Sequence, residues 1–370
     1  MTGTRADFGK LRPLMDKIEG SEMLENYIFV TGMHTLAKYG PTFLEVQKQN
    51  YKNVFIYMNQ THTTDLDTIL ANTITGFGNF IKEIKPDMIV IHGDRVEALS
   101  GAIVGAFNNI LVSHIEGGEI SGTIDESIRH SVTKLSHIHF VSNVEAKNRL
   151  IQMGERKSSI FVIGSPDIDV MMSSNLPDIT TVKTHYDIHF NDFGILIFHP
   201  VTTELHLLKN QVKNLVDAIL QMKQNVIVVY PNNDTGSSII LNEYKRLQYK
   251  KNIRIFPSIR FEYFLTLLKN SQFIIGNSSV GIKESEIYGI PSINIGNRQN
   301  KRSANKNIIN IDCYKKEIVN AINKIGEKKV RRSYTFGDGK SAEKFYEIIN
   351  KNTIWKTSVQ KQFVDHHNKK

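Results

Sequence analysis

The segment TDLDTILANTITGFGNFIKEIKPDMIVIHGD, residues 64–94, joins a helical pattern directly to a strand pattern. Its first part, residues 64–84, carries apolar side chains at helical spacing, and residues 87–94 form a short apolar run rich in Ile and Val. A strand that is apolar on both faces is typical of a parallel sheet covered by helices. The segment therefore predicts a repeating unit of an α/β fold.

The same rhythm of short apolar runs and amphipathic stretches continues on both sides of this segment. In the first half of the chain the predicted strands are 27–32, 53–58, 87–94, 110–118, 137–142 and 160–166. In the second half they are 194–200, 225–231, 253–258, 272–277, 291–296 and 307–312. The polar segment 173–193 between the two sets is predicted to be a linker with a short helix.

Two sets of strands predict two Rossmann-like, doubly wound domains, covering residues 1–170 and 171–340. Residues 341–370 are expected to form a C-terminal helix and tail that return to the first domain. Open α/β sheets bind ligands at the carboxyl ends of their strands, so we expect the ligand in a cleft between the domains. The chain opens on the loop TGTRADFGK, and the strand expected before such a loop is not in the sequence.

Composition narrows the classes of function. The 370 residues are 40% hydrophobic and 22% charged, which is typical of a globular protein. No apolar run approaches the ~18 residues of a membrane span, and the N-terminus lacks the apolar core of a signal peptide. Cys313 is the only cysteine, so the chain can form no internal disulfide, which fits a cytoplasmic location. The net charge of +9 suits small anionic substrates, and without a nucleic-acid-binding motif we expect neither nucleic acid nor a membrane as partner.

The stretch TGTRADFGK, residues 2–10, superficially resembles a phosphate-binding P-loop. The match fails, because Gly3 and Gly9 are one residue too far apart and Leu11 occupies the position of the magnesium-binding Ser or Thr. What remains is a glycine-containing turn at a helix start, with Arg5 at its tip. Such a turn can present backbone N–H groups and a guanidinium to a phosphate, and a plain surface arginine is the alternative.

Three carboxylates are the candidate acid/base groups. Asp94 follows a strongly apolar strand, Glu116 ends the next strand before two glycines, and Asp125 starts the following helix. Like charges gathered in one site raise the pKa of at least one of them, which creates an acid/base pair. Arg95 is a candidate phosphate ligand beside Asp94, and the alternative is an ordinary Asp–Arg pair that caps a helix.

Glu126 is a weaker candidate than Asp125, because Thr123 and Glu126 have the T-x-x-E spacing of a capping box. The histidines of this half match no standard metal-ligand spacing, so we expect no metal; they are His92, His114, His130, His137 and His139. The last two alternate within an apolar strand and are expected to be structural.

The second half offers a candidate nucleotide site. His199, at the end of its first strand, is expected to point across the cleft, with a capping or core role as the alternative. Ser278 and Ser279 lie where a helix is predicted to start, and free N–H groups there favour phosphate. Glu284 is expected about two turns into that helix, where a carboxylate could accept both hydroxyls of a ribose. Phe261 could stack on a base, although core packing is the simpler interpretation.

Taken together, these motifs resemble the hydrolysing UDP-N-acetylglucosamine 2-epimerases, which initiate sialic acid synthesis in bacteria. The motifs are TGTRADFGKL, IHGDR, HIEGGEISGTIDESIRH, HPVTTE, YPNNDTG, GNSSVGIKE and the region around Arg298. The likeness runs in order from residue 1 to about residue 345. It implies the two-domain GT-B fold, a UDP-sugar substrate, no cofactor and a homo-oligomer, either a dimer or a tetramer.

The resemblance also implies roles for individual residues. Asp94, Glu116 and Asp125 become the acid/base carboxylates, and His199 becomes the group that meets the departing diphosphate. The implied phosphate ligands are Arg5, Arg95, Ser278 and Ser279. The remaining UDP contacts are Glu284, Asn232, Phe261 and Arg298. Such an enzyme releases UDP and N-acetylmannosamine by way of a glycal.

Alternatives to this function remain. The same reaction could use a UDP-diacetamido-trideoxyhexose of a legionaminic acid route, because the sugar pocket is poorly marked in the sequence. A non-hydrolysing epimerase is disfavoured by the stretch HIEGGEISGTIDESIRH, residues 114–130. A GT-B glycosyltransferase would need an acceptor but not three clustered carboxylates, and a non-catalytic nucleotide-sugar sensor is the last alternative.

Overall fold

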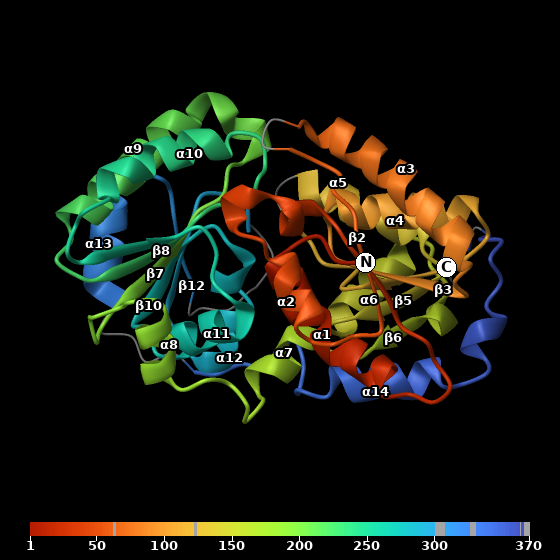
Figure 1. The fold of residues 1–370 in the computed structure, drawn as a ribbon. Coiled ribbons are helices and arrows are strands. Elements are labelled where there is room, and N and C mark those ends of the chain that lie inside the picture. The colour runs from red at the N-terminus through yellow and green to blue at the C-terminus, as the bar shows by residue number, and fades with distance from the viewer. Residues whose placement is uncertain (62–63, 122–123, 300–307, 326–330, 363, 366–370) are drawn as a thin grey trace, which may run out of the picture. The chain divides into compact units, whose positions relative to one another are not determined.

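The computed structural model describes residues 1–61, 64–121, 124–299, 308–325, 331–362 and 364–365 (Figure 1). The chain divides into two compact units. The first unit contains Met1–Ile120, Asp125–Ser173 and Thr335–Lys370. The second unit contains Ser121–Ile124 and Ser174–Tyr334.

The first unit is built on parallel strands. One sheet has the order β3-β4-β5-β6, with strands Met88–His92, Leu111–Ile115, Ile138–Val141 and Ile160–Val162. Two further strands pair with each other in parallel, β1 (Tyr27–Val30) and β2 (Asn53–Ile56). The helices of this unit are α1 (Arg5–Glu19), α2 (Phe43–Gln47), α3 (Leu66–Ile84), α4 (Val96–Phe107), α5 (Ile124–Leu135), α6 (Val144–Gln152), α7 (Pro166–Met171) and α14 (Ser341–Ile349).

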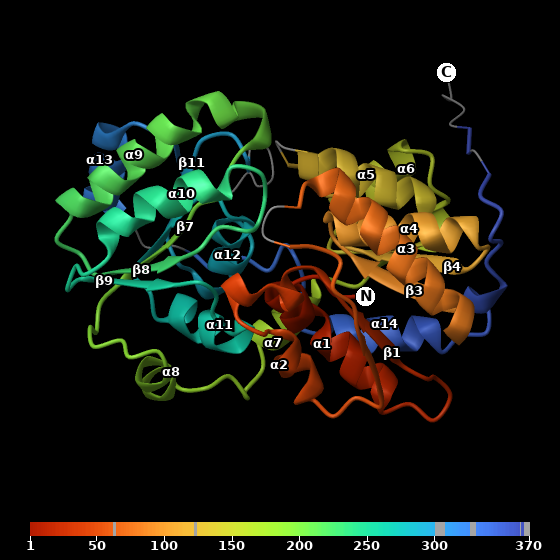
Figure 2. The same ribbon diagram turned by 45° about the horizontal axis from the view of Figure 1, so that its top comes forward.

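Helices bury both faces of the first unit's larger sheet, as expected for apolar parallel strands. On one face Ile91 belongs to the same buried cluster as Phe77 of α3. On the other face Phe140 packs with Leu14 of α1 and with Phe345 of α14, whose ring meets that of Phe140 edge to face at a centroid distance of 4.8 Å. Figures 1 and 2 show α3 and α4 on one side of these strands and α1 and α14 on the other.

The second unit is a single parallel sheet in the order β12-β11-β10-β7-β8-β9. In chain order its strands are β7 (Gly194–Ile197), β8 (Val226–Val229), β9 (Ile253–Phe256), β10 (Phe273–Gly276), β11 (Ser292–Ile295) and β12 (Ile308–Ile311). Its helices are α8 (Ile179–His185), α9 (Leu205–Gln221), α10 (Ser237–Tyr244), α11 (Phe261–Lys269), α12 (Glu284–Tyr288) and α13 (Lys315–Ile325). Leucine and valine side chains of α9 form the main core cluster with the central strands.

The predicted α/β class is confirmed: both units are built of Rossmann-like parallel sheets flanked by helices. Each predicted strand coincides with an observed one, but most strands end earlier than the apolar run suggests. For example, the run 110–118 contains the strand Leu111–Ile115, and the run 194–200 contains Gly194–Ile197. The residues beyond these ends leave the ladder and form the polar loops of the candidate site. In the described parts of the chain, none of the helices combines the length and apolar character needed to cross a bilayer.

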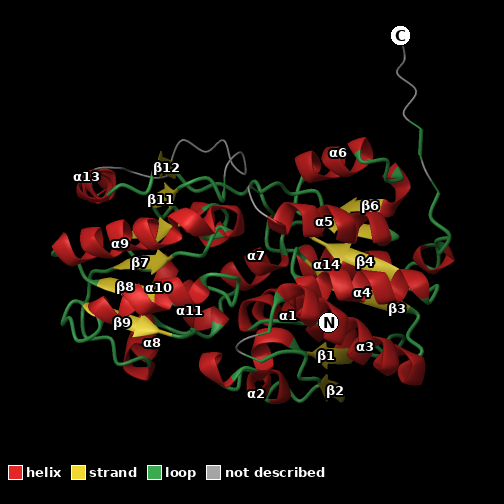
Figure 3. Cartoon of the chain, turned by 90° about the horizontal axis from the view of Figure 1, so that it is seen from above, coloured by secondary structure: helices red, strands yellow, loops and turns green. Residues whose placement is uncertain are grey.

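The start of the chain lies between β1 and β3. Thr2 forms a single parallel bridge with Val30 of β1, and the amino group of Met1 donates a hydrogen bond to the carbonyl oxygen of Val90 in β3 at 3.2 Å. Figure 3 shows the N-terminus at this position, with β1 and β2 on one side and β3 on the other. The described strands of the first unit form two sheets, β1-β2 and β3-β4-β5-β6.

Candidate active site

The first polar cluster is centred on His92, the last residue of β3, which lies between two carboxylates. Its Nδ1 atom is 2.7 Å from Oδ1 of Asp7, and its Nε2 atom is 3.2 Å from Oε2 of Glu116. All three side chains are largely buried. An imidazole can donate to a carboxylate at both nitrogens only when both are protonated, so this geometry suits the imidazolium.

The electrostatics of the cluster agree with that protonation state. Burial alone would lower the pKa of His92, but the hydrogen bonds and charges of Asp7 and Glu116 outweigh it and raise the pKa to about 10. Burial opposes ionisation of Asp7 as well, yet the hydrogen bond and charge of His92 keep the pKa of Asp7 below its ordinary value. At neutral pH the histidine is therefore a cation, which favours the carboxylate form of Glu116.

Local sequence fixes the position of Asp7 in the first turn of α1. Thr4 is the N-cap of α1, and its hydroxyl accepts a hydrogen bond from the backbone N–H of Asp7 at 3.0 Å. The backbone N–H of Gly3 donates to Oδ2 of Asp7 at 3.0 Å, which leaves Oδ1 directed at His92. The N–H of Gly3 in this turn thus orients the Asp7 carboxylate, and phosphate binding by the turn stays a prediction.

Glu116 has a left-handed backbone conformation, with φ +64°, which is unusual for a residue other than glycine. Such strain, of order 1–3 kcal/mol, persists only where the surroundings enforce it. The N–H of Glu116 donates to the carbonyl oxygen of Phe140 at 2.8 Å. Two residues later Gly118 has φ +78°, and a Cβ atom there would lie 2.4 Å from the carbonyl oxygen of Ala146. The turn after β4 is therefore held in one conformation, with the Glu116 carboxylate facing His92.

Asp94 is paired with Arg129, whose side chain is only 1% exposed. The Nη1 atom of Arg129 also donates to the carbonyl oxygen of Glu119 at 3.0 Å. Asp125 lies one helical turn before Arg129 in α5, and residues four apart in a helix are neighbours on one face. The predicted carboxylates thus lie around the ends of β3 and β4 and the start of α5. The cationic partners of Asp94 and Glu116 are Arg129 and His92, which are not among the predicted site residues.

Glu126 lies one turn before His130, with Oε1 at 3.4 Å from Nε2 of that histidine. Thr123, the other half of the predicted capping box, is outside the described residues. The capping role of Glu126 therefore stays a prediction.

The two arginines predicted to bind phosphate each have an acidic partner. The Nη2 atom of Arg5 is 2.6 Å from Oε1 of Glu45, and the Nε atom of Arg95 is 3.2 Å from Oε2 of Glu97. Glu97 is almost completely buried, so its charge needs this partner. A phosphate that binds Arg5 would have to share or displace Glu45.

Asn277 organises the polar cluster of the second unit, at the end of β10. Its side chain receives a hydrogen bond from the backbone N–H of His199 at 2.7 Å and donates one to the carbonyl oxygen of His199 at 2.8 Å. The ring of His199 accepts the backbone N–H of Asn232 at Nδ1, at 3.1 Å. In the neutral ring the proton is therefore on Nε2, which makes Nε2 the hydrogen-bond donor.

Gly276 allows this cluster to form, because it pairs with Ile197 at the end of β7. It has φ +135°, and a Cβ atom there would lie 1.8 Å from the carbonyl oxygen of Ile197. The carbonyl oxygen of Asn277 accepts hydrogen bonds from Arg298 at 3.2 Å and from Gln299 at 3.0 Å. The close approach of β7 and β10 thus fixes both His199 and Arg298.

Ser278 caps a short 3₁₀ turn, Ser279–Gly281, and its hydroxyl accepts the N–H of Val280 at 3.4 Å. The expectation that Glu284 lies two turns into a helix is wrong, because Glu284 is the first residue of α12. The N–H groups of residues 282 and 283 both bond to the carbonyl oxygen of Ser279, at 2.9 and 3.0 Å, so the turn closes on itself before α12 begins. Glu284 is nevertheless buried, with 1% of its surface exposed.

Phe261 is the first residue of α11, and it is 5% exposed. In this structure its ring presents little surface to a nucleotide base. The burial agrees with core packing, the simpler of the two interpretations.

The remaining histidines have structural partners. Burial lowers the pKa of His114 to about 3, so its ring is neutral, and Nε2 is 2.9 Å from the carbonyl oxygen of Gly93. His139 lies 3.1 Å from Glu155, and His137 donates to the carbonyl oxygen of Val359 at 2.9 Å. Among the described residues, no group of three or more His, Cys, Asp or Glu side chains could hold a metal ion.

Comparison with known proteins identifies the relatives of this chain. A family model described as UDP-N-acetylglucosamine 2-epimerase matches residues 16–350. The chain belongs to the UDP-N-acetylglucosamine 2-epimerase family. The UDP-N-acetylglucosamine 2-epimerase of Neisseria meningitidis serogroup B is 49% identical over 369 residues, which cover 99% of this chain and 98% of that protein.

Two further proteins are similar to this epimerase-family chain. The hydrolyzing UDP-N,N'-diacetylbacillosamine 2-epimerase of Legionella pneumophila is 33% identical over 356 residues, 94% of each chain. The crystal structure of the Methanocaldococcus jannaschii UDP-GlcNAc 2-epimerase, in complex with UDP-GlcNAc and UDP, has a TM-score of 0.80 at 24% identity, covering 94% of this chain and 97% of that one. This likeness confirms the GT-B type of fold.

Four residues of this candidate site are not predicted from the sequence: Asp7, His92, Arg129 and Asn277. Asp7 and His92 lie within the motifs TGTRADFGKL and IHGDR, but the sequence predicts no role for Asp7, and His92 is considered there only as a metal ligand. A usable signal existed for Asp7, because an acidic residue three positions after Thr4 marks the first turn of a helix. Arg129 and Asn277 carry no comparable signal, since a helical arginine and a loop asparagine are common everywhere.

Proposed function

We propose that this protein is a hydrolysing 2-epimerase that converts UDP-N-acetylglucosamine and water into UDP and N-acetylmannosamine, the first step of sialic acid synthesis. The observation that carries the proposal is the contact of His92 with Asp7 and Glu116, because it keeps a buried carboxylate ready to accept a proton. Membership of the family and the similarity to the Neisseria enzyme support the choice of substrate.

The chemistry of the substrate sets the order of events. C2 of the sugar has no neighbouring carbonyl, so its proton is not acidic in the ground state. Loss of UDP therefore leads, and positive charge develops at C1 while a carboxylate removes the C2 proton to give a glycal. Water then adds across the double bond, with hydroxyl at C1 and a proton delivered to C2 from the opposite face. The product is the free sugar with C2 inverted, and the steps need a general base and a general acid.

The first unit supplies these acid and base groups. Glu116 is the base for the C2 proton, since the imidazolium of His92 favours its carboxylate form. Asp94 and Asp125 complete the set by protonating C2 and activating water. Arg129 holds Asp94 in position and balances its charge.

The second unit binds the nucleotide. Ser278, Ser279 and Arg298 bind phosphate groups of the nucleotide. Arg5 and Arg95 of the first unit are further proposed phosphate ligands. Glu284 and Asn232 hold the ribose and the base, while the burial of Phe261 favours its role in core packing. Negative charge builds on the departing diphosphate, so the Nε2 proton of His199 contributes most at that moment.

The resemblance to the hydrolysing epimerases supports a homo-oligomer, either a dimer or a tetramer, and the single cysteine fits a cytoplasmic location. An isologous dimer is the commonest closed assembly. Light scattering of the purified chain measures the oligomeric state directly.

A second candidate substrate is the UDP-diacetamido-trideoxyhexose of a legionaminic acid route. The Legionella relative supports it, because that protein is named for UDP-N,N'-diacetylbacillosamine. The Neisseria relative is more similar to this chain, 49% against 33% identical, which favours UDP-N-acetylglucosamine.

The test is to incubate the protein with UDP-N-acetylglucosamine alone in D2O and to identify the products by NMR. We expect UDP and N-acetylmannosamine carrying deuterium at C2. UDP-N-acetylmannosamine would instead indicate a non-hydrolysing epimerase, and unchanged substrate would indicate a transferase or a sensor. A parallel reaction with UDP-N,N'-diacetylbacillosamine ranks the two sugars by kcat/KM.

A further inference from the structure

The turn after β4, residues 116–119, is held by two arginines from different helices, and we call it the Glu116 turn. Nη1 of Arg149, on α6, donates to the carbonyl oxygen of Gly118 at 3.1 Å. Nη1 of Arg129, on α5, donates to the next carbonyl oxygen, that of Glu119, at 3.0 Å. Arg129 already belongs to the candidate active site, whereas Arg149 forms no ion pair with the acid/base carboxylates in the described part of the chain.

One face of α6 lies along this turn. Ser142, directly after β5, donates to Oε1 of Glu119 at 3.1 Å. A Cβ atom at Gly118 would lie 2.4 Å from the carbonyl oxygen of Ala146. Arg149 comes three residues after Ala146, and residues three apart lie on the same face of a helix. The turn therefore has its backbone against α6, with the guanidinium of Arg149 at the Gly118 carbonyl.

The backbone of the Glu116 turn is strained and needs support. Glu116 has φ +64° and Gly118 has φ +78°, and a left-handed residue other than glycine costs of order 1–3 kcal/mol. The N–H of Glu116 donates to the carbonyl oxygen of Phe140 at 2.8 Å, which fixes the start of the turn. The bonds from the two arginines fix its end. Oε2 of Glu116 is 3.2 Å from Nε2 of His92, the long end of the hydrogen-bond range, so a small backbone rotation breaks this contact.

An ordinary surface ion pair does not account for Arg149. The side chain is half-buried, and among the described residues no carboxylate pairs with it. It lies in the last turn of α6, where a cation can bind the free carbonyl groups of its own helix, yet it donates to Gly118 instead. A hydrogen bond from a charged donor is about twice as strong as one between neutral groups. The position of Arg149 thus suits a strong bond to the turn.

We propose that Arg149 is a positioning residue of the epimerase reaction: by holding the Gly118 carbonyl, it keeps the Glu116 carboxylate at Nε2 of His92. This inference rests on the proposed function, in which Glu116 is the base for the C2 proton. Arg149 acts through the turn and not on the substrate. None of the proposed UDP ligands belongs to the Glu116 turn or to α6, so loss of Arg149 should lower kcat and leave UDP binding unchanged.

The protonation of His92 gives a measurement besides turnover. Burial lowers the pKa of His92, but the hydrogen bonds and charges of Asp7, on α1, and of Glu116 raise it to about 10. Another ionisable group near it is His114, which carries no charge because burial lowers its pKa to about 3. The pKa of His92 therefore reports whether the Glu116 carboxylate is in place.

Arg149→Met removes the guanidinium and keeps most of the side-chain length. We expect kcat to fall about 10- to 100-fold, because a misplaced catalytic group costs up to that much, while the Kd for UDP stays within about 2-fold. The pKa of His92, measured by NMR titration with isotope-labelled histidine, should fall by about 1 or more, since its contact with an opposite charge is lost. Arg149→Lys keeps a charged donor without the planar fork, so it should restore part of both kcat and this pKa.

Lys147→Met is the matched control on the same helix. The ammonium group of Lys147 also donates to a backbone carbonyl, that of Ile160 at 3.0 Å, but this carbonyl belongs to β6 and not to the Glu116 turn. Its loss removes an equivalent bond of α6. Lys147→Met should therefore leave kcat and the pKa of His92 unchanged.

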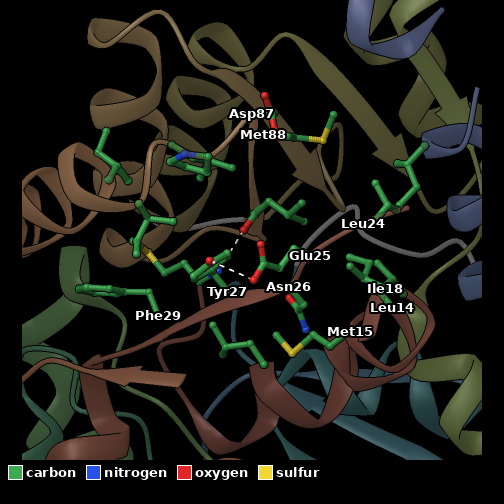
Figure 4. Close-up of a pocket in the computed structure, with 18 of the residues that line it drawn as sticks. Leu14, Met15, Ile18, Leu24, Glu25, Asn26, Tyr27, Phe29, Asp87 and Met88 are labelled. Atoms are coloured by element: carbon green, nitrogen blue, oxygen red, sulfur yellow. Dashed lines mark hydrogen bonds between the residues drawn. The ribbon is translucent and has the colours of Figure 1, made fainter. Parts of the chain in front are cut away.

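Leu24→Ala controls for a loss of stability alone. Leu24 lines an apolar cavity of about 350 Å³ (Figure 4), whose other lining residues include Tyr27 and Met88, the first residues of β1 and β3. The Glu116 turn follows the carboxyl end of β4, which is parallel to β3, so the cavity lies towards the opposite end of these strands. Leu24→Ala should lower Tm and leave the pKa of His92 unchanged.

A double-mutant cycle with Glu116→Gln decides whether Arg149 acts through Glu116. In the Glu116→Gln background, Arg149→Met should lower kcat no further, because residues that act as a unit are not additive. An equal loss of kcat in both backgrounds would overturn the proposal. So would an Arg149→Met enzyme that matches Lys147→Met in both kcat and the pKa of His92. A parent enzyme that releases no UDP from UDP-N-acetylglucosamine would count against the proposed function instead, and the titration of His92 would still test the positioning.

Discussion

The Nδ1 atom of His92 lies 2.7 Å from Oδ1 of Asp7, although the two residues are 85 positions apart in the chain. This contact ties the first turn of α1 to the end of β3. It also sets the charge of the imidazole, whose other nitrogen faces Glu116.

Substitution of Asp7 by Asn should lower the alkaline limit of activity. The pKa of His92 is raised to about 10, so the protonated state is complete at neutral pH and is lost as the pH rises through that value. Without the Asp7 charge, His92 loses its proton at lower pH and Glu116 loses its cationic partner. The pH dependence of kcat/KM between about pH 6 and pH 10.5 measures the shift. Asp67→Asn, at an exposed position of α3, is the control, and an unchanged limit in Asp7→Asn would count against this role.

Removing charge from the three carboxylates without changing their shape should abolish most of the turnover. Asp94→Asn, Glu116→Gln and Asp125→Asn should each lower kcat by about 10²-fold or more, as loss of a positioned acid or base does. The Kd for UDP, measured by calorimetry, should barely change.

Glu126→Gln is the matched control for Asp125→Asn, because the two residues are adjacent in the first turn of α5. If Glu126 has only a structural role, its loss should cost about 1 kcal/mol of stability or less and leave the chemistry nearly intact. An inactive but folded Glu126→Gln enzyme beside an active Asp125→Asn enzyme would show that the acid/base residue of the pair is Glu126.

Ser278→Ala and Glu284→Gln should each weaken UDP binding by about 10-fold, which corresponds to about 1.4 kcal/mol. Both residues follow β10, next to Asn277 and the short 3₁₀ turn. Ser285→Ala is the control, since that hydroxyl donates to the carbonyl oxygen of Gly281 at 2.8 Å inside the fold. The assignment of Ser278 and Glu284 to the UDP site is wrong if both of their variants bind UDP as tightly as the parent and the Ser285→Ala control.

The C-terminal tail should become less firmly attached in acid. Oxygen atoms of Glu155 lie 3.1 Å from His139, 2.8 Å from Lys134 and 2.6 Å from Lys361 of the tail. Burial opposes ionisation, yet the hydrogen bond from His139 and the nearby ammonium groups lower the pKa of Glu155 to about 2. A lowered pKa stabilises the fold above the ordinary glutamate value, about 4.3, and this stability is lost as the pH falls towards 2.

Urea unfolding of the parent and of Glu155→Gln at several pH values tests this. The parent should exceed Glu155→Gln in unfolding free energy by the largest amount above about pH 5, and this difference should become smaller below about pH 4. Glu145→Gln, at an exposed position of α6, should show no such change. If the difference in unfolding free energy between the parent and Glu155→Gln stays constant with pH, the charge of the Glu155 carboxylate does not stabilise the attachment of the tail.

The strands could be predicted from the sequence because burial on both faces leaves a continuous apolar run. The polar motifs at strand ends could be predicted too, since parallel strands place their carboxyl ends at one edge. The contact between Asp7 and His92 could not, because nothing in either segment encodes a partner 85 residues away. The left-handed backbone conformation of Glu116 could not be predicted either, because it depends on the hydrogen bond to Phe140 and on the packing of Gly118.

The error at Glu284 has a tertiary cause. The sequence GNSSVGIKE reads as the start of one helix, but a Cβ atom at position 281 would meet the hydroxyl of Ser292 at 2.7 Å. The backbone at Gly281 lies close to β11. The chain therefore forms the short 3₁₀ turn Ser279–Gly281, and α12 begins separately at Glu284. Helix propensity does not report such an approach.

Gly276 limits how this protein can evolve. Any larger residue would push β10 away from Ile197 and would displace Asn277, and with it His199 and Arg298, in a single step. A library containing every substitution at this position should therefore return only glycine among active clones, even alanine being excluded. New sugar preferences would have to arise from changes in the surrounding side chains, while this one position stays constant through all of them.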